Sequence, residues 1–138
     1  MEAEGYDFAI RAYLIPLILA AVVGQSLVSL ARGADIASRL RDREAFASVA
    51  LGWIPVVLLG ALPYWLGGVF YGPAELSMDS VAVTDVMSGA IHSWFESMSG
   101  FTTTGSTVID HATSPRCNEG SDCISSQPQS LILWRSLT

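Results

Sequence analysis

Oxygen-bearing groups suited to binding a cation are concentrated in residues 100–107, which have the sequence Gly-Phe-Thr-Thr-Thr-Gly-Ser-Thr. Residues 89–99 come before them and predict a short amphipathic helix of about eleven residues, too short to cross a bilayer. The C-terminus of a helix carries a partial negative charge, which attracts a cation. An extended segment placed there can turn its carbonyl groups toward the ion and replace its hydration water. The order of residue types therefore indicates a cation-binding segment.

Two glycines have specific expected roles in this segment. Gly100 follows the predicted helix at a C-terminal cap position, and Gly105 permits backbone conformations that other residues disfavour. Taken alone, the Thr-rich string also fits an ordinary Ser/Thr-rich loop. Its place between apolar segments favours a cation site, because irregular backbone at membrane depth is tolerated where it lines a cavity.

Two uncharged apolar segments, residues 12–31 and residues 45–71, are long enough to span a membrane. About twenty helical residues cover a hydrocarbon core of ~30 Å. Pro16 lies near the start of the first segment, where a helix tolerates proline. Pro55 and Pro63 are expected to kink the second helix or to end it early. A pair of buried helices in a soluble protein is the alternative, but the chain has little polar sequence left to form a soluble shell.

The composition excludes some functions and orients the predicted helices. Only 14% of the 138 residues are charged and the net charge is −6, whereas nucleic-acid binding requires a basic patch. No phosphate-binding loop or activated nucleophile is present, so we expect no enzyme. Residues 32–44 hold four of the seven basic residues, which places this linker in the cytoplasm. Residues 72–127 then begin outside, where their acidic side chains either concentrate cations or form an ordinary solvated loop.

A resemblance to a known family is carried by residues 95–108, with the sequence Phe-Glu-Ser-Met-Ser-Gly-Phe-Thr-Thr-Thr-Gly-Ser-Thr-Val. This run resembles the first pore loop of the Trk/Ktr/HKT potassium transporters, and most closely that of the Trk-type membrane subunit. Residues 42–46 and 60–64 resemble the helix before that loop, and residues 131–138 resemble the start of the helix after it.

The resemblance implies a pore built from four covalently linked helix–pore-loop–helix repeats, each with one filter strand and a central glycine. Gly105 would be the filter glycine of the first repeat. Glu96 would brace the filter through hydrogen bonds together with Gly100, although an ordinary exposed carboxylate is the alternative. The implied K⁺ ligands are the carbonyl groups of Thr103, Thr104, Gly105 and Ser106, with Thr102 and Thr107 at the ends of the ion path.

Two features depart from the family pattern. His92 occupies a position near the predicted pore-helix start where the family often has an acidic residue, and we interpret it as a polar helix-start residue rather than a metal ligand. The loop 110–127 is long and contains Cys117 and Cys123. Their spacing favours a small disulfide-bonded loop on an oxidising outer face. Free thiols are the alternative, and zinc would require two further ligands.

The predicted fold is an all-α integral membrane protein of the multi-pass type in the plasma membrane. It has two transmembrane helices, a re-entrant pore helix with a selectivity-filter loop, and the start of a third transmembrane helix at residues 131–138. Residues 1–40 form the first helix and a cytoplasmic linker, and residues 41–138 form the first repeat, incomplete at its C-terminus.

The expected function is potassium uptake as the N-terminal part of a longer transporter, with K⁺ as the transported ion and no organic cofactor. The family implies membrane lipid, the remaining repeats, a cytoplasmic nucleotide-binding regulatory subunit and a homodimeric complete protein as partners, and no nucleic acid. A channel assembled from four copies is one alternative. The other is a truncated, non-conducting membrane protein that associates with transporter subunits.

Overall fold

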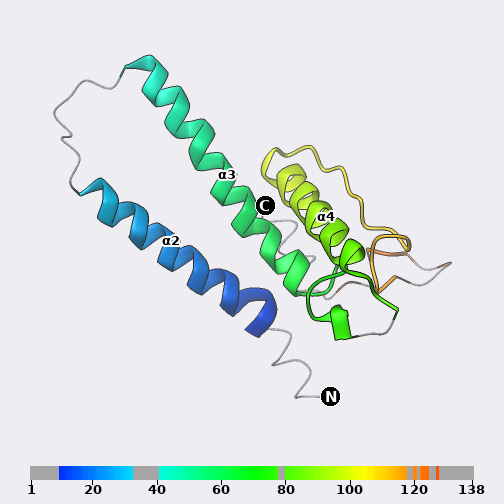
Figure 1. The fold of residues 1–138 in the computed structure, drawn as a ribbon. Helices are drawn as coiled ribbons and strands as arrows, with labels where there is room; N and C mark the ends of the chain where they lie inside the picture. Colours follow the sequence, from blue (N-terminus) through cyan, green and yellow to red (C-terminus); the bar gives the residue numbers. More distant parts are fainter. Residues whose placement is uncertain are drawn as a thin grey trace.

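Three α-helices form most of residues 10–32, 41–77, 80–117, 120, 122–124 and 127, which the computed structural model describes (Figure 1). They are α2 (Ile15–Ala31), α3 (Asp42–Leu66) and α4 (Val83–Phe101). A π-helical turn, η1 (Ile10–Leu14), leads into α2, and a 3₁₀ turn, η2 (Glu75–Ser77), lies between α3 and α4. These described residues contain no strand, so the predicted all-helical fold is confirmed for them. The linker 33–40 and the predicted third helix at 131–138 lie outside the described residues.

The first predicted span is confirmed as one apolar helical segment, Ala12–Ala31. Pro16 lies in the first turn of α2, directly after the π-helical turn. Proline has no N–H to donate to the preceding turn. The wider π-helical turn coincides with this missing hydrogen bond.

The second helix, α3, is displaced toward the N-terminus relative to the prediction of residues 45–71. It begins at Asp42 because the Arg41 N–H donates to the Glu44 carboxylate at 3.1 Å and closes its first turn. It runs through Pro55 and Pro63 and ends at Leu66, before the end of the uncharged segment at residue 71. Gly68, with φ +69°, reverses the chain just beyond this end.

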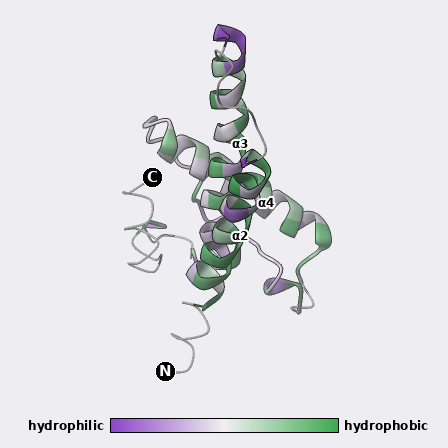
Figure 2. Cartoon of the chain, turned by 90° about the vertical axis from the view of Figure 1, so that its left-hand side faces the viewer, coloured by the Kyte–Doolittle hydropathy of each residue, from purple (hydrophilic) through white to green (hydrophobic). Residues whose placement is uncertain are grey.

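Most apolar side chains of α2 and α3 point away from the rest of the chain. Pro16 is the one buried residue of α2, and Leu30 and Phe46 are each 78% exposed. Hydrophobic residues predominate along these helices in Figure 2. The core helix of a soluble protein would bury such residues. Two helices of this chain, Ala12–Ala31 and Asp42–Leu66, are thus long and apolar enough to cross a membrane.

The third helix, α4, has 19 residues and is much longer than the predicted 89–99. It begins at Val83 because the Ala82 N–H donates to the Asp85 carboxylate at 2.9 Å. Asp85, an acidic residue at the third helical position, is a helix start signal. His92 consequently lies in the middle of the helix, and its interpretation as a helix-start residue is wrong.

The helices pack around a small core at one end of α3. Tyr64, Val69 and Phe70 are buried there, and Tyr13, Val108 and Ile109 pack against them. α3 lies between α2 and α4, and the segment after α4 returns along that helix (Figure 1). The core therefore joins η1, the end of α3 with the residues just after it, and the returning segment.

Candidate functional site

Close contacts between small residues fix α4 against α3. The Ser97 hydroxyl donates to the Val57 carbonyl of α3 at 2.8 Å, and both residues are buried. A Cβ atom added at Gly60 would lie 2.6 Å from the Ser97 oxygen and from the Phe101 ring. Further along, the Trp65 indole N–H donates to the Val86 carbonyl at 3.2 Å. Small residues and interhelical hydrogen bonds are the usual means of helix association in membranes.

The chain leaves α4 through a hydrogen-bonded turn with an unusual residue in its left-handed position. The Thr103 N–H donates to the Gly100 carbonyl at 2.9 Å, and the Thr104 N–H donates to the Ser99 carbonyl at 3.0 Å. This pattern is a Schellman cap, whose left-handed residue is usually glycine. Here it is Thr103, with φ +55°. Gly100 lies inside the last turn of α4, so its predicted role as the capping residue is wrong.

A β-branched residue in the left-handed region is strained. Thr103 lies within the segment that sequence analysis proposed as a filter strand. Strained backbone of this kind is concentrated at binding and catalytic sites. Gly105, two residues further, also has a positive φ of +72°, with open space where a side chain would project.

Three hydrogen bonds tie the returning segment to α4. The Ser99 hydroxyl donates to the Ser106 carbonyl at 2.7 Å. The Thr107 hydroxyl and the Val108 N–H both donate to one oxygen of Glu96, at 3.1 and 3.2 Å. Glu96 is only 2% exposed, so it is not the ordinary exposed carboxylate of the alternative interpretation. Its carboxylate therefore joins α4 to the returning segment, and a bracing role in a filter stays a prediction.

The six predicted ion-path residues form one continuous exposed stretch, residues 102–107. Their polar groups are not equivalent. The Thr102 hydroxyl donates to the Met98 carbonyl at 2.7 Å and lies 2.9 Å from the Thr104 hydroxyl. The Ser106 carbonyl is directed at α4 by its bond from Ser99. Thr103 and Thr104 lie at the C-terminal end of α4, whose last turn contains no basic residue to offset its negative end.

A loop after residue 109 returns to the end of α3. The Arg116 guanidinium donates to the Gly68 carbonyl at 2.9 Å and to the Gly67 carbonyl at 3.2 Å. A cation bound just beyond the C-terminal end of a helix offsets the helix dipole. Cys117 and Cys123 are joined in a disulfide with their Cα atoms 5.0 Å apart, which is the alternative that their spacing favoured. Sequence reasoning missed Arg116, because its partners are 48 and 49 residues away.

His92 is separate from these groups. Its ring packs edge-on against Phe70, with ring centres 5.7 Å apart, and its buried Nδ1 atom finds no hydrogen-bond partner among the described residues. Burial lowers the pKa of this imidazole, which lies outside the two candidate spans, because its charged form is desolvated. These surroundings are those of a neutral packing residue.

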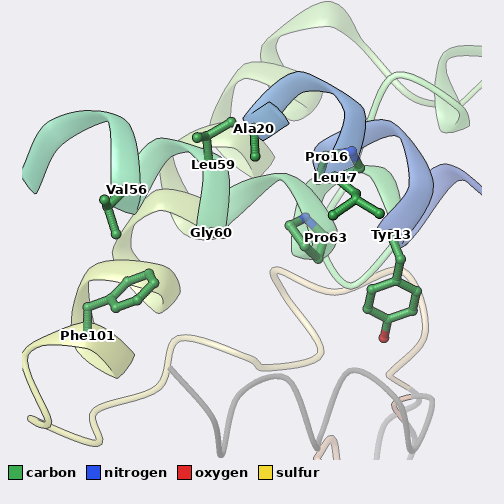
Figure 3. Close-up of a pocket in the computed structure, with 9 residues that line it drawn as sticks. All are labelled: Tyr13, Pro16, Leu17, Ala20, Val56, Leu59, Gly60, Pro63 and Phe101. Carbon is green, nitrogen blue, oxygen red and sulfur yellow. The ribbon is translucent and has the colours of Figure 1, made fainter. Parts of the chain in front are cut away.

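An apolar cavity of about 390 Å³ lies between α2, α3 and the end of α4 (Figure 3). Leu17, Val56, Leu59 and Phe101 contribute to its wall, and the one polar side chain among its lining residues is that of Tyr13. Such a wall offers no set of oxygen ligands for a cation. The cavity is therefore not an ion site.

Comparisons of this chain with protein-family models, curated proteins and solved structures found no match.

Proposed function

We propose that this chain is a membrane protein that contributes one filter strand, residues 102–107, to a potassium-conducting pore. The observation that carries the proposal is the braced strand itself. One side of the returning segment is bound to α4 through Glu96 and Ser99, while residues 102–107 stay exposed. An extended segment that is bound to a helix on one side and exposes oxygen-rich groups on the other is suited to bind a dehydrated cation.

The proposal places α2 and α3 across the bilayer and α4 with its returning segment as a re-entrant hairpin. Arg116 binds the C-terminal end of α3, so the loop after the hairpin lies at the same end of α3 as the connection that leads into α4. The chain thus enters and leaves on one side. The linker charges assign that side to the outer face, and the disulfide accords with an oxidising compartment.

Within the strand, the structure favours some of the proposed K⁺ ligands over others. Thr103 and Thr104 lie directly at the negative end of α4, and Gly105 provides the backbone freedom that a row of aligned carbonyls needs. The Ser106 carbonyl already accepts a hydrogen bond from Ser99, so it would bind an ion through its second lone pair. Thr102 and Thr107 use their hydroxyls in bonds to α4, consistent with places at the ends of the path.

One strand cannot surround an ion, so the proposal requires three more strands from elsewhere. The sequence resemblance supports four further parts of the proposal. These are the remaining repeats of a Trk-type subunit, a homodimer of that subunit, its cytoplasmic regulatory partner and its plasma-membrane location. The carbonyl path proposed here would carry K⁺ down its gradient, without covalent chemistry.

A matched pair of glycine substitutions tests the filter assignment. Gly105 and Gly120 both have positive φ values, +72° and +86°, and a side chain at either would meet no atom within 4 Å. Gly105→Ser and Gly120→Ser therefore carry similar backbone penalties. The gene that encodes this chain would be expressed in bacteria that lack K⁺ uptake, and competition between Rb⁺ and Na⁺ uptake would be measured.

We expect Gly105→Ser to reduce the K⁺-over-Na⁺ preference at least about tenfold at equal membrane abundance, because a displaced carbonyl changes the ion's coordination. Gly120→Ser should retain the wild-type preference. An unchanged preference in Gly105→Ser would refute the filter assignment. No uptake by the wild-type protein under any condition would favour the non-conducting alternative.

A further inference from the structure

A mixed group of metal-binding side chains lies in the loop beyond the filter segment. Asp110, His111 and Cys123 each offer one ligand atom, and these three atoms all lie within 4.8 Å of one another. The side chains of Asp110 and His111 are both more than half exposed, at 57% and 54%, so an ion has free access. The sequence disfavoured a zinc site because the two cysteines lacked further ligands. The fold places Asp110 and His111 beside Cys123, and these residues can supply them.

The disulfide connects a fourth donor to this group. Cys117 is bonded to Cys123, so its sulfur lies one S–S bond from the Cys123 sulfur of the group. Two thiolates bound to one tetrahedral zinc ion at ~2.3 Å are about 3.8 Å apart. Breaking the disulfide lets the sulfurs separate to this distance while their backbones stay close, with Cα atoms 5.0 Å apart in the bonded form.

The contact between Asp110 and His111 defines their separate roles. The His111 Nδ1 atom lies 2.6 Å from the Asp110 Oδ1 atom. Two nitrogen or oxygen ligands of a tetrahedral zinc ion are about 3.3 Å apart, so the shorter distance indicates a direct contact between the two side chains rather than a shared metal. A carboxylate on Nδ1 orients the ring and leaves Nε2 for the metal, as in many zinc sites.

We propose that reduction of the Cys117–Cys123 disulfide creates a zinc site in this loop. Its protein ligands are the two thiolates and the Nε2 atom of His111, with Asp110 as the orienting partner and the fourth position open to water. A small dithiol is the reductant. It transfers two electrons and two protons to the disulfide and becomes a cyclic disulfide, and the zinc ion then displaces the two thiol protons.

Zinc binding to the full 138-residue chain in detergent micelles tests this proposal. The protein would be reduced with dithiothreitol, freed of it by gel filtration under argon, and compared with the oxidised protein by equilibrium dialysis against Zn²⁺. Co²⁺ would serve as a spectroscopic probe, because cobalt bound by thiolates gives charge-transfer absorption. We expect the reduced protein to bind one equivalent of zinc and the oxidised protein to retain none.

Three variants locate the site. His111→Ala and Asp110→Asn should each weaken zinc binding by the reduced protein about 10–100-fold. His92→Ala removes the other histidine of the chain, and it should bind zinc as the wild type does. Equal zinc binding by the reduced and oxidised forms, or by the reduced His111→Ala and wild-type proteins, would overturn the proposal. Absence of thiolate-to-cobalt absorption in the reduced wild type would overturn it without any variant.

Discussion

At Gly89, α4 lies in close contact with the backbone that follows α3. A Cβ atom added there would collide with the backbone carbonyl of Tyr71, and it would also lie close to the Tyr71 nitrogen. These are main-chain atoms, so no side-chain rotation can relieve the contact. Gly89→Ala therefore forces α4 and the segment around Tyr71 apart.

The expected effect combines three contributions. Alanine favours the helix over glycine by about 1 kcal/mol. Overpacking against fixed atoms costs about 1–3 kcal/mol. Separation of the two elements also weakens the bond from the Trp65 indole to the Val86 carbonyl, 3.2 Å in the structure, which is worth about 1 kcal/mol. The net loss in the free energy of unfolding is about 1–3 kcal/mol.

Titration with SDS in mixed micelles, followed by circular dichroism, measures this loss. Gly52→Ala in α3 is the matched control, since a Cβ atom there would meet no atom within 4 Å. It should be neutral or stabilising by up to about 1 kcal/mol, because alanine favours the helix. A Gly89→Ala protein as stable as the wild type would refute the close approach of α4 to Tyr71.

Two further substitutions probe the ends of the helices in the same unfolding assay. Thr103→Gly should raise the unfolding free energy by about 0.5–1 kcal/mol, because the left-handed conformation costs threonine more than the added flexibility of glycine; a loss of stability would contradict the described turn. Arg116→Gln should lower the unfolding free energy by about 1 kcal/mol, because the carbonyls of Gly67 and Gly68, just beyond α3, lose a charged donor on an exposed side chain. Arg116→Lys retains the positive charge but not the planar guanidinium group, so its free energy of unfolding should lie between those of the wild type and Arg116→Gln. A loss of stability as large as that of Arg116→Gln would contradict a contribution from the charge.

Helix positions could be predicted where they depend on local composition. The apolar run that gave the first span needed no knowledge of its neighbours, and the structure has the same bounds, Ala12–Ala31. The start of α4 was missed because the prediction began the helix at residue 89 and did not use the start signal of Asp85. The uncharged segment extends past the end of α3 because residues beyond Leu66 are apolar for a different reason, which is that Val69 and Phe70 belong to the core.

The candidate site was predictable in outline but not in its contacts. Glu96 was singled out through its place in a familiar run, whereas its two hydrogen-bond donors became evident only when the chain turned back after Thr103. The donor group of Asp110, His111 and the cysteines depends on a loop conformation that spacing alone does not specify. Such arrangements are set by contacts between distant residues, to which periodicity and capping rules do not apply.

The way α3 and α4 are joined has a consequence for how their pairing responds to temperature. Their contact includes the small residue Gly60, the bond from Ser97 to the Val57 carbonyl and the bond from the Trp65 indole to the Val86 carbonyl. In the proposed bilayer location, parting the helices would transfer their apolar side chains to lipid instead of water. The heat-capacity change of separation, which arises from hydration of apolar surface, would then be small. The stability of this helix pair would consequently vary almost linearly with temperature, without the pronounced maximum that water-soluble domains show.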